Sequence, residues 1–155
     1  MAASPYRVAL HVAAPFDRRV RRRPLAALAR RALAEEAARP GVELSVVVTD
    51  DETVMELNRR YRGVDEPTDV LSFGLDDRDD GFAAFPDAPT LLGEIVISYP
   101  TAERQAAAAG RPLEDELAHL LAHGVLHVLG YDHERPAEAR RMRAREEALL
   151  GRPAH

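Results

Sequence analysis

The segment from 117 to 133 constrains the chain more than any other, because it combines a helical pattern with regularly spaced histidines. It reads LAHLLAHGVLHVLGYDH. Residues four apart on a helix lie one above the other, about 6 Å apart along the axis. His119, His123 and His127 therefore share one face, while leucine and valine side chains occupy the positions that face the core. The segment predicts a buried helix that presents three imidazole rings.

A fourth histidine follows the end of this helix. Gly130 can take the left-handed conformation that ends a helix, and the chain can then turn back so that His133 approaches His123 and His127. Three imidazoles can bind zinc at about 2.0–2.1 Å and leave a fourth position for water, which is typical of a catalytic site. The alternative is a set of ordinary core or surface histidines. However, four of the six histidines of the chain fall in this one segment, which favours metal binding.

The role of His119 stays open at this point. It is a candidate for a group that supports a ligand, for a substitute ligand, or for a plain surface residue. The pattern predicts one Zn²⁺ ion on His123, His127 and His133, with His119 in a supporting role.

Composition limits the kinds of metal site and the classes of protein that fit this chain. The 155 residues fit one domain, 1–155, and include no cysteine, which excludes disulfides and thiolate zinc sites. The net charge of −5 is unlike that of a general nucleic-acid coat protein, although a local basic stripe would suffice for binding. No apolar run approaches the ~20 residues of a membrane span, and the start of the chain lacks a signal-peptide pattern. We therefore expect a cytoplasmic protein with no membrane partner.

Periodicity indicates an α+β or α/β protein in which strands and helices share one core. Proline and glycine mark most of the boundaries, and the stretch 76–89 is polar and loop-like. Either Thr49 with Glu52, or Asp50 alone, is expected to cap the second helix. The expected strands are 6–12, 42–49, 68–73 and 93–98, and the expected helices are 24–38, 51–60, 100–109, 112–130 and 134–150.

The histidine spacing invites comparison with zinc proteases of the His-Glu-x-x-His-x-x-Gly-x-x-His type. The three histidines and Gly130 match that motif, but Gly124 stands where the protease has its glutamate. Peptide hydrolysis by that mechanism would lack its general base. A zinc metallopeptidase is therefore an alternative that Gly124 disfavours.

The stretch from His123 to His133, HGVLHVLGYDH, resembles the signature of the YbeY family of bacterial zinc-dependent endoribonucleases. Further similar segments follow the same order, namely NRRYRGVDEPTDVLSF at 58–73, LGEIVIS at 92–98, and Glu138, Ala139 and Met142. The resemblance spans about residues 40–150. It implies an α+β fold with a central mixed sheet of about four strands surrounded by helices, and zinc on the three histidines.

The resemblance also implies a function. It indicates a zinc-dependent, single-strand-specific endoribonuclease acting in 16S rRNA 3′-end maturation and ribosome quality control in the cytoplasm. The implied partners are ribosomal RNA and ribosomal subunits, with ribosomal proteins or GTPases as candidate protein partners. A non-catalytic ribosome-assembly factor whose metal only braces the fold is the other alternative. Arg62 would lie near the site, so that the expected catalytic residues are Arg62, His123, His127 and His133.

Arg62 is the candidate that would stabilise negative charge on the reacting phosphate. Either a metal-activated water or the 2′-hydroxyl of RNA could be the nucleophile.

Asp69 or Asp132 could orient an imidazole or serve as an ordinary turn cap, and Thr68 and Ser72 are better explained as strand residues. Runs of like charge such as the arginine cluster within 18–23 more often form a solvated face than an RNA contact. Arg59 and Arg60 could widen the basic surface near Arg62.

Overall fold

Four strands in the described part of the chain form one mixed sheet in the order β1-β2-β4-β3. The computed structural model describes residues 4–63, 68–74, 90–131 and 134–151. Strands β1 (Arg7–Val12), β2 (Val42–Thr49) and β4 (Thr90–Ser98) run parallel, whereas β3 (Val70–Gly74) pairs antiparallel with β4 and forms one edge. The predicted α+β fold with a four-stranded mixed sheet is therefore confirmed.

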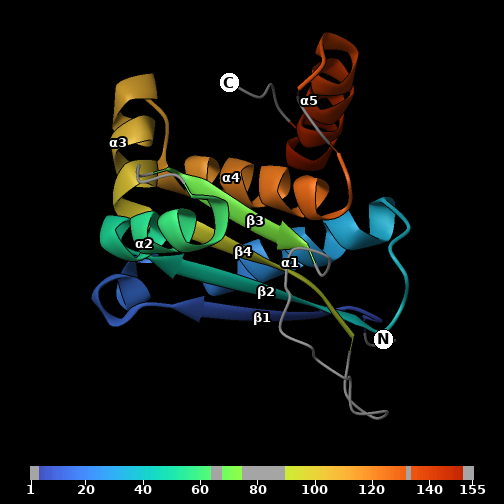
Figure 1. The fold of residues 1–155 in the computed structure, drawn as a ribbon, viewed down its shortest axis with the longest axis horizontal. Coiled ribbons are helices and arrows are strands. Elements are labelled where there is room, and N and C mark those ends of the chain that lie inside the picture. The colour runs from blue at the N-terminus through green and yellow to red at the C-terminus, as the bar shows by residue number, and fades with distance from the viewer. Residues whose placement is uncertain (1–3, 64–67, 75–89, 132–133, 152–155) are drawn as a thin grey trace.

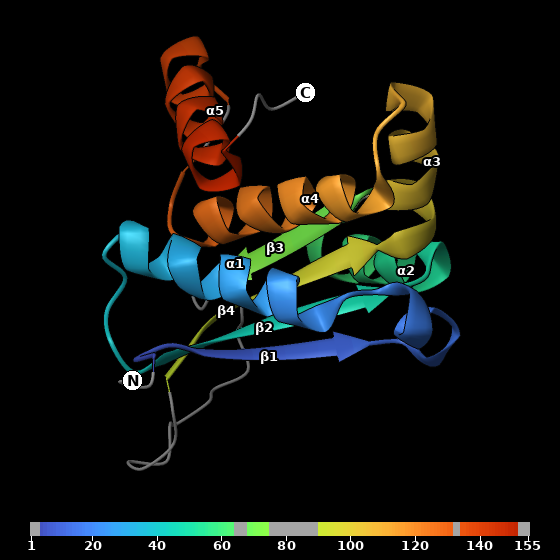
Figure 2. The same cartoon turned by 180° about the vertical axis from the view of Figure 1, so that it is seen from behind.

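Helices cover the two faces of the sheet unequally. Helices α1 (Arg22–Glu35) and α4 (Leu113–Val128) pack on one face, and the shorter α2 (Asp51–Arg62) lies on the other (Figures 1 and 2). The remaining helical elements are η1 (Ala14–Arg19), α3 (Tyr99–Ala109) and α5 (Pro136–Leu150). No helix among the described residues is long and apolar enough to cross a membrane.

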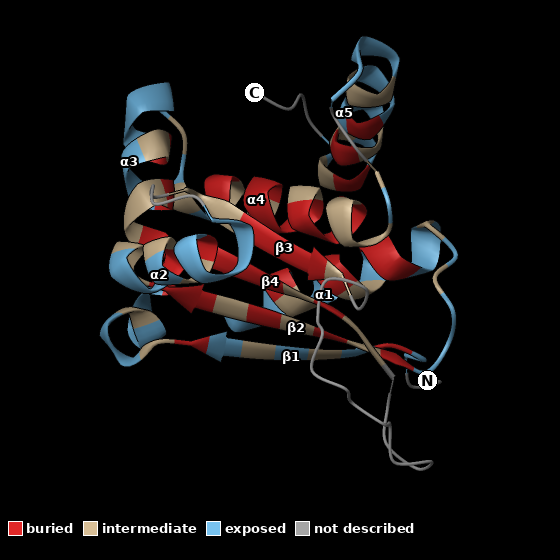
Figure 3. Ribbon diagram, viewed as in Figure 1, coloured by how far each residue is buried: buried red, intermediate tan, exposed pale blue. Residues whose placement is uncertain are grey.

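The core follows from the alternation of side chains along the strands. Ile95 and Ile97 of β4 point into the main core beneath α1 and α4, whereas Val96 belongs to a smaller cluster beneath α2. Leu71 and Phe73 of β3 join that smaller cluster. Figure 3 shows buried residues along β2, β3, β4 and α4, while much of β1 is exposed. The helix that carries the histidines is thus anchored in the best-packed part of the molecule.

Gly124 allows α4 to approach the sheet closely. A Cβ atom at this position would lie 2.7 Å from Cγ2 of Ile95, which is too close for any side chain. Because Gly in a helix interior is destabilising by about 1 kcal/mol relative to Ala, its presence here reflects the close packing of helix on strand. The glutamate of the protease motif would have no space at this position.

Several observed boundaries differ from the expected ones by up to three residues; for example, α2 ends at Arg62 rather than 60, β4 begins at Thr90 rather than 93, and α4 ends at Val128 rather than 130. The first helix ends at Glu35 rather than near 38, because Ala37 takes a left-handed conformation with φ 55°. Asp50, and not Thr49, caps α2, since its side chain accepts a hydrogen bond from the Thr53 amide at 2.7 Å. The third strand begins at Val70 rather than 68. The stretch 76–89 lies outside the described residues.

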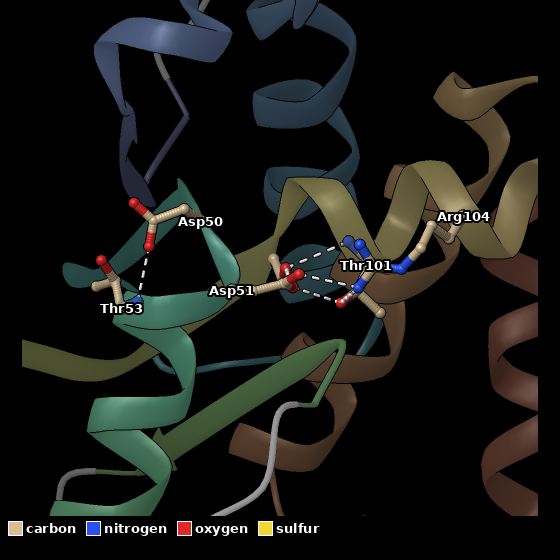
Figure 4. Close-up of polar contacts among 6 residues, drawn as sticks. Asp50, Asp51, Thr53, Thr101 and Arg104 are labelled. Atoms are coloured by element: carbon tan, nitrogen blue, oxygen red, sulfur yellow. Dashed lines mark hydrogen bonds and ion pairs between the residues drawn. The ribbon is translucent and has the colours of Figure 1, made fainter.

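Asp51 joins two helices at the ends of β2 and β4 (Figure 4). One carboxylate oxygen accepts hydrogen bonds from Ser98 and from Thr101, the latter at 2.6 Å, and the other accepts from Arg104 at 2.9 Å. Burial opposes the ionised form, but the hydrogen bonds from Ser98, Thr101 and Arg104 outweigh it and lower the pKa of Asp51. The ionised carboxylate therefore stabilises the junction of α2 and α3.

This contact predicts a pH-dependent loss of stability. A carboxylate whose folded pKa is depressed stabilises the fold above its unfolded pKa of about 3.9, and that contribution disappears as the pH falls through the folded value. We expect Asp51→Asn to lower the free energy of unfolding by about 1 kcal/mol at pH 7. Urea unfolding at pH 7 and near pH 3 measures both values. The difference between wild type and variant should shrink at the lower pH, and a constant difference would contradict the role of the charge.

Candidate active site

Helix α4 presents its histidines along one face, as the spacing predicts. The ring centroids of His119 and His123 are 6.5 Å apart, and those of His123 and His127 are 5.8 Å apart. His119 is buried, with 9% of its surface exposed, whereas His123 and His127 are half-buried. The interpretation of His119 as a plain surface residue is therefore wrong. The two remaining rings of this face lie where α4 becomes accessible to solvent.

Glu146 links the first two histidines to the last helix. Its Oε1 atom lies 3.0 Å from Nε2 of His119 and 3.3 Å from Nδ1 of His123. Burial opposes the ionised form of this carboxyl, but hydrogen bonds from His119 and His123 outweigh it and lower the pKa of Glu146 to about 2. An ionised carboxylate can only accept hydrogen bonds, so both facing ring nitrogens carry a proton. In a neutral His123, the lone pair then lies on Nε2.

Sequence reasoning missed Glu146. The sequence did contain a signal, because Met142 and Glu146 are four residues apart on one stripe of an otherwise arginine-rich helix. The structure shows that both side chains are buried. A carboxylate on the apolar stripe of a helix requires a partner, since an unsatisfied buried charge is costly. Only the packing of α5 against α4 shows that the partners are histidines.

Arg62 shares a pocket with two of the histidines. Its Nη2 atom donates to the carbonyl oxygen of Ser72 at 2.7 Å, and its guanidinium carbon lies 5.6 Å from the centre of the Phe73 ring. Both contacts hold the side chain against the edge strand β3. The pocket has a volume of about 270 Å³ and is lined by Asn58, Arg62, Thr68, Asp69, Val70, Leu71, Ser72, His123 and His127.

The third predicted ligand cannot be placed. His133, together with Asp132, lies outside the described residues, and within those residues no group of three acidic, histidine or cysteine side chains that could hold a metal ion is found. His123 nevertheless fits a zinc ligand, because metal-bound histidines commonly donate their second ring N–H to a carboxylate. Glu146 is such an acceptor.

Other sequence candidates have structural partners. Asp69 accepts from the Val70 amide at 2.8 Å, so it caps the start of β3. Ser72 is a strand residue, as expected, and Thr68 lies just before the strand; both line the pocket. These contacts make the mouth of the pocket polar.

The arginine cluster within 18–23 lies far from the pocket. Its five arginines are all exposed, and Arg21 pairs with Glu114 at 3.1 Å. Glu114 stands in the first turn of α4 and His127 in the last, which separates them by about 20 Å along the helix. The cluster is therefore not part of the wall of this pocket.

The family model for endoribonuclease YbeY matches residues 15–153. The chain belongs to this family. A Roseiflexus castenholzii protein named endoribonuclease YbeY is 59% identical over 111 residues, which cover 71% of this chain and 69% of that protein. One of the same name from Dehalococcoides mccartyi is 46% identical over 143 residues, covering 88% of this chain and 89% of that protein.

A solved structure shares the fold of this YbeY-family chain. The solution structure of a Thermotoga maritima protein has a TM-score of 0.56 and 25% sequence identity, and the match covers 93% of this chain and 89% of that one. The assignment made from the histidine segment is therefore confirmed, and with it the enzyme class that the YbeY family name carries, an endoribonuclease.

The contact between Glu146 and the two histidines generates a prediction about folding and tautomers. Glu146→Gln keeps the shape of the side chain but removes the charge, so we expect a loss of about 1.5–3 kcal/mol in the free energy of unfolding. We also expect the ring of His123 to lose its strong preference for a proton on Nδ1. Chemical denaturation and two-dimensional ¹H–¹⁵N spectra of the imidazoles measure these effects. Glu147→Gln, at the next position of the same helix, is the control and should change neither.

Proposed function

We propose that this chain is a cytoplasmic, zinc-dependent endoribonuclease that cleaves single-stranded RNA in 16S rRNA 3′-end maturation and ribosome quality control. The observation that carries the proposal is the convergence of His123, His127 and Arg62 on one pocket. Family membership supports the reaction class. Ribosomal RNA and ribosomal subunits are the proposed partners, with ribosomal proteins or GTPases as candidate protein partners.

His123, His127 and His133 are the proposed zinc ligands. When bound, zinc would act as a Lewis acid that stabilises negative charge on the reacting phosphate. Glu146 orients the ring of His123 so that Nε2 can serve as the ligand atom. His119 shares the same carboxylate, and we therefore assign it a supporting role rather than a ligand role.

Arg62 is the proposed partner of the phosphate. Guanidinium groups bind phosphate oxygens through two parallel hydrogen bonds, and such bonds are stronger than neutral ones. Ser72 and Phe73 fix the orientation of the Arg62 side chain before substrate binds. A preformed donor costs little reorganisation when charge develops on the phosphate.

Two observations disfavour the peptidase alternative. Gly124 has no space for a catalytic glutamate, because even a Cβ atom would contact Ile95. In addition, the edge strand β3 has backbone groups already bound by side chains, since Ser72 accepts from Arg62 and Val70 donates to Asp69. A peptide substrate that binds by strand addition needs such groups for its own backbone.

The zinc proposal is tested by removing the metal and the ligands separately. We expect a chelator to abolish cleavage of a 16S rRNA precursor carrying its 3′ extension, and zinc to restore it. His123→Ala, His127→Ala and His133→Ala should each lower bound zinc well below about one ion per chain, while His11→Ala, on the exposed strand β1, should not. Elemental analysis and RNA cleavage measure the two effects. Equal cleavage by the chelated protein would refute zinc dependence, and cleavage of peptides but never RNA would favour the peptidase.

The role of Arg62 is tested by one substitution that removes the positive charge and one that keeps it. Arg62→Ala should lower kcat/KM for RNA cleavage by about 10²–10³-fold, the usual effect of losing one preorganised donor. Arg62→Lys should restore little, because an ammonium group cannot form the planar pair of hydrogen bonds.

Arg39→Ala, an exposed arginine in the turn before β2, is the control and should retain activity. Melting temperatures separate catalysis from folding. Full activity of a folded Arg62→Ala variant would disprove the assigned role.

A further inference from the structure

Tyr61 is unusual because it leaves a large ring in solvent. It is 57% exposed, and no other large hydrophobic side chain in the described part of the chain is classed as exposed. The other three tyrosines are less exposed, since Tyr6 and Tyr99 are buried and Tyr131 is half-buried. An exposed aromatic ring of this kind, one residue before an arginine that lines the pocket, is a candidate contact for a ligand.

The position of Tyr61 relates it directly to the candidate active site. It precedes Arg62 in the last turn of α2. The centre of its ring lies 5.4 Å from that of Phe73 in an edge-to-face arrangement, and the guanidinium of Arg62 lies 5.6 Å from the same Phe73 ring. The buried Phe73 therefore supports both the exposed ring and the pocket arginine.

We propose that Tyr61 is a stacking platform for one base of single-stranded RNA whose backbone passes over Arg62. This inference rests on the proposed ribonuclease function and adds a subsite to it. Unpaired bases stack on exposed aromatic side chains in a manner that tolerates sequence. A base inside a duplex already stacks on its neighbours, so the same platform selects single strands.

Local charge favours RNA over a protein as the occupant. The last turn of α2 carries Arg59, Arg60 and Arg62 in the same turn as Tyr61, and of these Arg59 pairs with Glu56. Arginine beside an aromatic ring provides both a phosphate contact and a base contact within one nucleotide. The polar lining of the adjacent pocket, which includes Asn58 and Thr68, is likewise unlike the apolar core of a protein–protein interface.

Three substitutions at this position separate stacking from simple apolar contact. Stacking contributes about 1–3 kcal/mol per base, which corresponds to a factor of about 5 to 150 in Kd. Tyr61→Ala and Tyr61→Leu should both weaken binding of a short single-stranded RNA by such a factor, whereas Tyr61→Phe should bind like wild type. Tyr61→Leu keeps an apolar contact with Phe73, so it tests the ring if Tyr61→Ala fails to fold. Fluorescence anisotropy at fixed salt measures Kd.

An abasic series identifies the stacked base. RNA oligonucleotides that lack a base at one position in turn are compared on wild type and on Tyr61→Leu. At one position the base removal should weaken binding to wild type and have no further effect on the variant. Additive effects at every position would overturn the proposal.

A fluorescent substitution gives a direct readout. The chain contains no tryptophan, so Tyr61→Trp introduces a single indole at the platform. Its emission should be quenched by single-stranded RNA and much less by a duplex of the same length. Unchanged emission at saturating single-stranded RNA would overturn the proposal.

The outcomes distinguish this inference from the proposed function. If wild type cleaves RNA and all Tyr61 variants bind and cleave equally, the stacking subsite is wrong and the ribonuclease assignment stands. If wild type neither binds nor cleaves RNA, the proposed function itself fails. Loss of binding to a protein from the ribosome, with RNA binding intact, would assign Tyr61 to a protein partner and refute the RNA subsite.

Discussion

The close contact between α4 and β4 is the constraint on which the site depends. Because Gly124 has no side chain, α4 can approach Ile95 closely, and this contact fixes the rotation of the helix about its axis. The residues on the core side, such as Leu121 and Val125, are then fully buried. His123 and His127 are consequently turned toward β3 and the pocket. The same packing that stabilises the domain orients the candidate metal ligands.

Two carboxylates on other elements complete this arrangement. Glu146 of α5 holds the rings of His119 and His123. Glu36, just after α1, accepts a hydrogen bond from the hydroxyl of Tyr131 and pairs with Arg145 of α5 at 2.6 Å. Tyr131 follows the glycine that ends α4, so this second contact fixes the chain immediately before the Asp132–His133 stretch. Through Glu146 and Arg145, helix α5 is thus linked both to the histidine face of α4 and to the Glu36 contact that holds Tyr131.

Local patterns predicted those features of the fold that depend on neighbouring residues. Helix α4, its histidine face and its end near Gly130 follow from residues three or four apart. The end of α1 was misplaced because alanine-rich sequence favours a continued helix, whereas Ala37 adopts a left-handed turn toward β2. The histidine partners of Glu146 and the Ser72 contact of Arg62 could not be found in this way, since each contact joins residues on different elements. The family resemblance supplied Arg62, which spacing alone would have left as an exposed helix-end arginine.

The edge strand shows how one element can serve both stability and specificity. An exposed edge offers backbone groups to any passing strand. In this chain Arg62 covers the Ser72 carbonyl and Asp69 covers the Val70 amide, so two backbone groups of the edge strand already have side-chain partners. Covering the edge with a guanidinium also brings positive charge beside His123 and His127. Under the proposed function, the guanidinium that occupies a backbone acceptor of the sheet edge would also bind the phosphate, so that protection of the edge and selection of a nucleic-acid substrate would depend on the same side chain.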